Sequence, residues 1–170
     1  MERLWAPWRI EYIEKQGSNE HECIFCSKPN ERNDRKNLII MRGKHVFVIL
    51  NAYPYTNGHL MVTPYRHIAT VLDMNEEEGM DMLKYLKISL ELLKDTLKPE
   101  GFNIGANIGK VAGAGIADHF HLHIVPRWSG DTNFMPVLVD TRIIPEYLEH
   151  TYEKLLAKLP EDEKSKLLLC

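Results

Sequence analysis

Five short segments of the chain carry the apolar and β-branched residues that are typical of strands, and turn residues bound each of them. They are residues 38–41, 45–51, 59–63, 102–107 and 119–125. The connections at 42–44 and 52–58 are too short to hold a crossover helix, which favours antiparallel pairing. The pattern predicts an antiparallel sheet of five or six strands.

Residues 75–98 instead repeat apolar side chains at spacings of three and four, which predicts one long amphipathic helix. Asp73 or Asn75 can cap its start, and Pro99 follows its end. A second helix is expected over 145–158, and helices segregated from an antiparallel sheet indicate an α+β fold. The predicted apolar stripe of the long helix consists of Met80, Leu83, Leu86, Leu90, Leu93 and Leu97.

Length and charge narrow the function classes. A chain of 170 residues favours one domain over 1–170, with an N-terminal arm over 1–20 that carries Trp5 and Trp8. The net charge of -3 argues against a protein that grips nucleic-acid backbones. No apolar run approaches the roughly 20 residues that span a bilayer, and the first residues contain no secretory apolar region. We therefore expect a cytoplasmic protein that binds neither nucleic acid nor membranes.

The segment from Asp118 to Arg127 places three histidines at alternate positions. Alternate side chains share one face of a strand, so His119, His121 and His123 are expected to lie together, opposite an apolar face. Packing does not favour histidine over threonine or lysine on an open face. Two chemical interpretations remain: a metal cluster, which three side chains spread along a line fit poorly, and nucleophilic catalysis by one imidazole assisted by a neighbour.

The seven residues from His119 to Val125 match, at every position, the His-φ-His-φ-His-φ-φ signature of the histidine triad superfamily, where φ is apolar. The resemblance extends over 22–128, the core of the domain, and leaves 129–170 as a C-terminal extension with a helix. Other segments look most like bacterial diadenosine-tetraphosphate phosphorylases and hydrolases of this superfamily. These segments are 3–9, 112–118 and 126–134.

The resemblance implies a reaction. His121 would attack the α-phosphorus of a purine nucleotide and form a covalent nucleotidyl-histidine, with dinucleoside polyphosphates as the favoured substrates. His123 would contact the α-phosphate and assist the departing group, and His59 would lie near the second nitrogen of the catalytic histidine or near the phosphate. The acceptor stays open between inorganic phosphate and water. Mg²⁺ is expected, if anywhere, on the substrate polyphosphate.

The resemblance also implies a nucleotide-binding set. Asn51 would hydrogen-bond the ribose, and Asn107 would bind phosphate oxygens. The glycine-rich turn, which includes Gly113 and Gly115, would offer backbone N–H groups to phosphate, although the turn taken alone is more typical of a plain hairpin loop. The nucleoside phosphoramidase branch carries a serine where this chain has Ile116, which disfavours phosphoramidate substrates. Asp118 could orient His119, bind a metal or cap the loop.

Cys23 and Cys26 form a lone Cys-x-x-Cys motif, which is weak by itself. Some bacterial triad proteins, and the related galactose-1-phosphate uridylyltransferases, complete such a site with two histidines, and the matching residues are His67 and His119. The resemblance therefore implies a structural zinc site of two cysteines and two histidines, which leaves His121 and His123 for chemistry.

Two rival functions and one assembly state complete the expectations. A non-catalytic, zinc-stabilised nucleotide-binding module would keep Asn51 and the glycine-rich turn but would not need His121. A metal-binding regulator would need more Cys and His clusters than the chain contains. The apolar stripe of the long helix and the tryptophans of the arm favour a homodimer.

Overall fold

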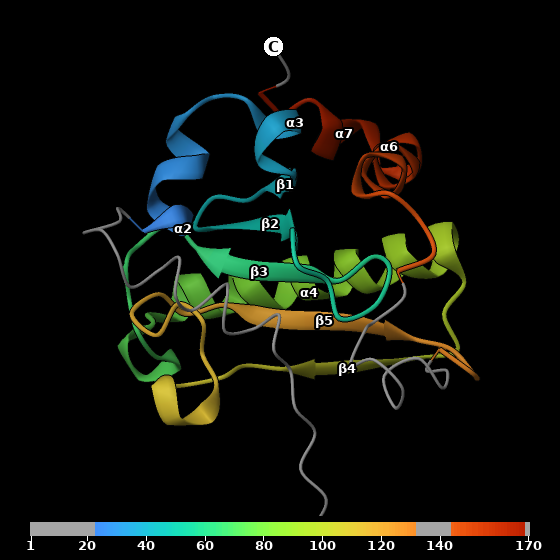
Figure 1. Ribbon diagram of the computed structural model, residues 1–170. Coiled ribbons are helices and arrows are strands. Elements are labelled where there is room, and N and C mark those ends of the chain that lie inside the picture. The colour runs from blue at the N-terminus through green and yellow to red at the C-terminus, as the bar shows by residue number, and fades with distance from the viewer. Residues whose placement is uncertain (1–22, 132–143, 169–170) are drawn as a thin grey trace, which may run out of the picture.

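The computed structural model describes residues 23–131 and 144–168. Within these ranges the strands form one antiparallel sheet in the order β1-β2-β3-β5-β4, with helices around it (Figure 1). The prediction of an α+β fold with an antiparallel sheet of five or six strands is confirmed, with five strands in the described residues. The strands are β1 (Ile39–Arg42), β2 (Val46–Leu50), β3 (Leu60–Pro64), β4 (Gly101–Gly105) and β5 (Leu122–Arg127).

The two predicted helices are present as α4 (Glu76–Leu97) and α6 (Leu148–Lys158). Asn75 caps α4: its side chain accepts a hydrogen bond from the Glu78 N–H, while the Glu78 carboxylate accepts one from the Asn75 N–H. Six short helical segments were not predicted. They are α2 (Ile24–Ser27), η1 (Lys28–Asn30), α3 (Asp34–Asn37), η2 (Val71–Asp73), η3 (Lys110–Ala112) and α7 (Glu161–Lys164).

The predicted apolar stripe of α4 is wrong at its N-terminal end. Met80 is 69% exposed and Leu83 is 54% exposed, whereas Leu86, Leu90 and Leu97 are partly buried against the core. The buried face is offset from the stripe and includes polar side chains. Its residues are Glu78, Met82, Tyr85, Ser89, Leu92 and Leu93.

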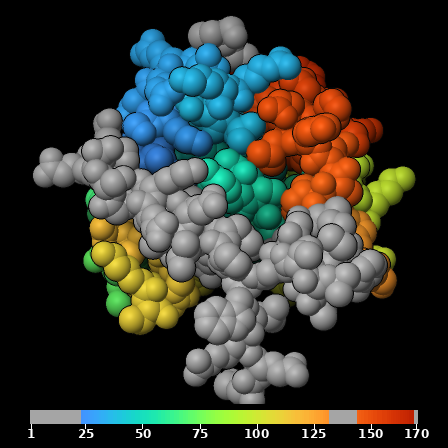
Figure 2. Space-filling view, viewed as in Figure 1, coloured from blue at the N-terminus to red at the C-terminus, as the bar shows by residue number. Residues whose placement is uncertain are grey.

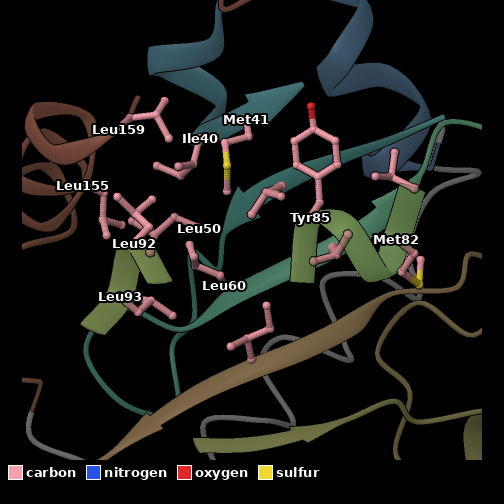
Figure 3. Close-up of a cluster of buried hydrophobic side chains, with 14 of the residues drawn as sticks. Ile40, Met41, Leu50, Leu60, Met82, Tyr85, Leu92, Leu93, Leu155 and Leu159 are labelled. Atoms are coloured by element: carbon pink, nitrogen blue, oxygen red, sulfur yellow. The ribbon is translucent and has the colours of Figure 1, made fainter. Parts of the chain in front are cut away.

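The sheet separates two clusters of buried apolar side chains. The larger cluster joins the sheet to α4 and α6, and Figure 3 shows side chains from these elements meeting one another. The smaller cluster lies on the other face and contains Phe25, Ile39, Phe47, Ile49 and Met61. Phe120 and Ile124 belong to the larger cluster, as the alternation predicted, so the histidines between and beside them turn toward the opposite face.

The C-terminal segment packs beside the β1 edge of the sheet. Tyr152 of α6 donates a hydrogen bond from its hydroxyl to the Ile39 carbonyl. Residues 34 and 168 exchange two hydrogen bonds, because the Asp34 N–H donates to the Leu168 carbonyl while the Leu168 N–H donates to the Asp34 carboxylate. Figure 2 shows this segment, in orange and red, beside the blue segment that precedes β1. Among the helices of the described ranges, none is long and apolar enough to cross a membrane.

Candidate functional site

The three triad histidines occupy different surroundings. β5 begins at Leu122, three residues later than predicted, so His119 and His121 precede the strand and only His123 lies within it. The Phe120 N–H donates to the Ile68 carbonyl (2.6 Å) and the Phe120 carbonyl accepts from the Thr63 hydroxyl (2.9 Å). These bonds hold the backbone before β5. Each of the three rings then has a different hydrogen-bond partner: the Pro64 carbonyl for His119, the His119 carbonyl for His121 and the His59 ring for His123.

His121 is held as one tautomer. Its Nδ1 lies 2.9 Å from the His119 carbonyl oxygen, which can only accept, so Nδ1 carries the proton. In the neutral ring the lone pair is then on Nε2. Burial lowers the pKa of His121, which favours the neutral form. The ring packs against Phe25, with centroids 5.0 Å apart, and against His123, with centroids 4.9 Å apart.

His123 is held as the opposite tautomer by His59. The Tyr55 N–H donates to Nδ1 of His59 (3.1 Å), so a neutral His59 carries its proton on Nε2. That nitrogen lies 2.9 Å from Nδ1 of His123, which must accept, and the proton of a neutral His123 is therefore on Nε2. The two rings, whose centroids lie 4.9 Å apart, therefore differ at Nε2: a neutral His121 has a lone pair there, and a neutral His123 has an N–H donor.

Asn51 and Gly58 fix the position of His59, which is fully buried. The Asn51 side-chain oxygen accepts from the Tyr53 N–H (2.9 Å), which turns its amide nitrogen toward Nδ1 of His59 (3.3 Å). Gly58 precedes His59 with a φ of +74°, and a Cβ there would clash with a Leu97 methyl group. Only glycine therefore fits this turn beneath α4 without a shift of Leu97.

The glycine-rich turn lies between β4 and the triad. Asn107 donates from its side chain to the Gly113 carbonyl (3.4 Å), and the Gly113 N–H donates to the Lys110 carbonyl (2.9 Å). The Asn107 amide and the Gly113 N–H thus bond inside the turn, while Gly115 is exposed. Gly105 of β4 pairs with His123, and among the described residues no atom lies within 4 Å of where a Cβ at Gly105 would be.

Cys23, Cys26, His67 and His119 converge, with one ligand atom of each within 4.8 Å of the others. Nδ1 of His119 lies 3.3 Å from Sγ of Cys23 and 3.2 Å from Nδ1 of His67. Tetrahedral zinc would separate two nitrogens by roughly 3.3 Å and a sulfur from a nitrogen by roughly 3.6 Å. Nε2–H of His119 donates to the Pro64 carbonyl (2.8 Å), which leaves its Nδ1 lone pair directed at the cluster. The four residues fit zinc.

The remaining sequence-derived candidates lie apart from this chemistry. Asp118 is exposed, Ile116 packs beside the smaller apolar cluster, and Nε2 of His45 lies 3.0 Å from the Glu77 carboxylate. His150 pairs with Tyr147 on the surface. His21 and the tryptophans of the N-terminal arm lie outside the described residues.

Sequence reasoning missed the contribution of Phe25 and of the Tyr55 N–H. Phe25 lies inside the Cys-x-x-Cys motif, and its position between two predicted ligands was the available signal. The backbone donor at Tyr55 has no residue-type signature, because every residue except proline carries an N–H.

Comparison with known proteins places these residues in a family. The HIT domain profile matches residues 32–130. The chain is 36% identical over 164 residues to an AP-4-A phosphorylase of Mycobacterium tuberculosis, covering 92% of this chain and 83% of the relative.

Two solved structures are also similar. A Zn-bound histidine triad family protein from Mycobacterium smegmatis has a TM-score of 0.66 at 28% identity, over 85% of this chain and 97% of that chain. A hypothetical histidine triad nucleotide-binding protein from Sulfolobus tokodaii has a TM-score of 0.65 at 28% identity, over 84% and 93%.

Proposed function

The chain belongs to the HIT domain family, and on that premise we propose that it is a nucleotidyl transferase or hydrolase acting on dinucleoside polyphosphates such as diadenosine tetraphosphate. The proposal takes the substrate class from the similarity to the AP-4-A phosphorylase of M. tuberculosis. The observation that carries the chemistry is the pair of opposite tautomers at His121 and His123.

In the first step, the Nε2 lone pair of His121 attacks the α-phosphorus, and the bond from phosphorus to the bridging oxygen breaks. The electron pair of that bond leaves with the departing phosphate chain, and Nε2–H of His123 donates its proton to the leaving oxygen. A neutral imidazole needs no base before it attacks, and burial lowers the pKa of His121, which favours this form near pH 7.

In the second step, an oxygen of inorganic phosphate or water attacks the same phosphorus and the P–N bond to His121 breaks. The proton of the acceptor passes to Nε2 of His123, which restores both rings. Two displacements at one phosphorus retain its configuration. Asn51, beside His59, would bind the ribose, and the glycine-rich turn with Asn107 and Gly115 would bind phosphate oxygens together with any Mg²⁺ that the polyphosphate carries.

We further propose that Cys23, Cys26, His67 and His119 bind a structural zinc ion. A bound zinc ion would cross-link the segment before β1 to His119, two residues before the nucleophile. The reaction steps above use only the histidines downstream of it.

The proposal is tested by rapid quenching of the wild-type protein with diadenosine tetraphosphate labelled at the α-phosphorus, followed by mapping of the labelled peptide. We expect label on His121, and no label in His121→Ala. His121→Ala should lose activity by several orders of magnitude while still binding nucleotide, because the ribose and phosphate contacts remain. Label on another residue, or near-normal activity of His121→Ala, would refute the mechanism.

The acceptor is decided by the products. Reactions run with and without inorganic phosphate distinguish a phosphorylase, which yields adenosine diphosphate only when phosphate is present, from a hydrolase, which yields adenosine monophosphate in both. We expect phosphate to act as an acceptor, because the family relative at 36% identity is a phosphorylase. Formation of adenosine monophosphate without adenosine diphosphate in phosphate buffer would contradict this.

A further inference from the structure

Phe25 is buried between the metal cluster and the proposed nucleophile. It is 1% exposed and packs with Phe47, Ile49 and Met61 on the sheet face that carries the histidines. Its ring centroid lies 5.3 Å from that of His119 and 5.0 Å from that of His121. This side chain takes no part in the metal cluster or in the two nucleotidyl-transfer steps.

A ring held by a single hydrogen bond still has freedom to rotate. The bond from Nδ1–H to the His119 carbonyl fixes one atom of the His121 ring, but the direction of Nε2 also depends on the plane of that ring. Phe25 packs against the ring with an interplanar angle of 41°, and His123 meets it edge-on at 82°. These two contacts set the plane, and therefore the line along which the lone pair points.

The Cys23–Cys26 segment is connected to two groups that hold His121: the ring of Phe25 and the backbone carbonyl of His119. Phe25 lies between the two cysteines, where the N–H groups of Cys26 and Ser27 donate to the Cys23 carbonyl at 2.8 and 2.9 Å. The sulfur atoms of these cysteines approach the ring of His119, whose carbonyl accepts from His121. The Cys23–Cys26 segment thus reaches the nucleophile through a backbone carbonyl on one path and through an aromatic ring on the other.

We propose that Phe25 is a positioning residue that holds the His121 imidazole in its reactive orientation, an inference that rests on the proposed function for its catalytic meaning. Loss of the ring contact leaves the nucleophile present but misdirected. Displacement of a reacting group by about 1 Å costs roughly 100-fold in rate. The effect falls on the chemical step rather than on substrate binding, because Phe25 is buried and does not offer a surface to the nucleotide.

The test compares Phe25→Leu with Phe47→Leu in the metal-loaded protein. Both substitutions remove a buried phenyl ring from the same cluster, but Phe47 stacks on Tyr65 and, among the described residues, makes no ring contact with a histidine. Nitrogen-15 NMR of histidine-labelled protein, assigned with His121→Asn, reads the tautomer of His121 directly without any substrate. In wild type and Phe47→Leu we expect one sharp Nδ1–H tautomer, whereas in Phe25→Leu we expect the His121 signals to broaden or to average between tautomers.

Turnover of diadenosine tetraphosphate supplies the second measurement. For Phe25→Leu we expect kcat to fall about 10- to 100-fold with KM changed by less than about threefold, while metal content and thermal stability match those of Phe47→Leu. A wild-type His121 signature in Phe25→Leu would overturn the positioning role, and so would equal losses of kcat in both variants. If the wild-type protein does not cleave this substrate, the proposed function fails while the NMR comparison still decides the role of Phe25.

Discussion

His121 and His123 are identical side chains two residues apart, and their environments give them different chemistry. A backbone carbonyl places the proton of His121 on Nδ1, and a chain of donors from Tyr55 through His59 places the proton of His123 on Nε2. Each assignment depends on a backbone group that can only donate or only accept. At the scale of single residues, the proposed acid and nucleophile are therefore distinguished by hydrogen bonds rather than by residue type.

This division of roles predicts the behaviour of His59→Leu. Without the donor to Nδ1, His123 loses the partner that keeps its proton on Nε2, so protonation of the leaving group becomes less efficient. We expect kcat on diadenosine tetraphosphate to fall about 10- to 100-fold, within the range of general acid catalysis. On an adenylate ester with a p-nitrophenolate leaving group, which departs without a proton, we expect the loss to be several times smaller.

His121→Ala provides the control for that comparison, because removal of the nucleophile should depress both reactions equally. The role of His59 would be contradicted if His59→Leu slowed both substrates by the same factor. Steady-state rates on the two substrates, with folding checked by circular dichroism, are sufficient for the measurement.

At the scale of elements, a charged side chain is buried at the start of α4. Glu78 is buried, closes the capping box with Asn75 and accepts two hydrogen bonds from Arg66, at 2.8 and 2.7 Å. The Arg66 hydrogen bonds lower the pKa of Glu78 to about 2, from 4.5. A carboxyl group with a lowered pKa in the folded state stabilises that state above pH 4.5, and the contribution disappears as the pH falls toward 2.

We therefore predict that Glu78→Gln is less stable than wild type at pH 7, by roughly 1–2 kcal/mol, because Arg66 is half exposed and solvent weakens the pair. The difference should shrink steadily as the pH falls from 4.5 toward 2. Urea unfolding over this pH range measures it. Glu77→Gln, which alters an exposed neighbour, should stay close to wild type throughout. A Glu78→Gln deficit that does not change with pH would be inconsistent with the assigned pKa.

The two cysteines of the Cys23–Cys26 segment lead to a prediction about zinc content. Elemental analysis of the purified protein should find about one zinc ion per chain. Cys23→Ser should lower both the zinc content and the melting temperature, because a closed site contributes directly to folding free energy. His45→Gln replaces a histidine that lies beside Glu77, away from the cluster, and should keep its zinc. A zinc-free protein with unchanged stability in Cys23→Ser would eliminate the site.

The sequence was sufficient to predict the order and type of the main elements but not which face of each element is buried. The α4 stripe was misplaced because periodicity recognises apolar identity, whereas the buried face includes Glu78 and Tyr85, whose polar atoms find partners in Arg66, Arg42 and Glu163. The residue types of the candidate site were visible in the sequence. The tautomers were not, because they depend on which backbone group each ring meets: the His119 carbonyl for His121 and, through His59, the Tyr55 N–H for His123.

At the scale of the whole molecule, the two edges of the sheet differ. The β1 edge lies beside the C-terminal segment, where Tyr152 bonds the Ile39 carbonyl. At the other edge, β4 pairs with β5, and within the described residues no further strand continues the sheet. Its Ile104 is 47% exposed. An open edge with an exposed apolar side chain is a site for pairing with another strand, so the β4 edge favours assembly.

We predict on this basis that the protein is a homodimer in which β4 lies at the interface, with the exposed Met80 and Leu83 of α4 as further apolar surface. Light scattering after size exclusion at micromolar concentration should give twice the mass of the chain. Ile104→Lys should give the monomer mass, because an isologous contact would bring two like charges close together at the two-fold axis. Leu72→Lys introduces the same charge at an exposed apolar position in η2 and should remain a dimer. A wild-type monomer would refute the assembly, and dissociation by both variants would show that added charge, rather than the β4 edge, controls it.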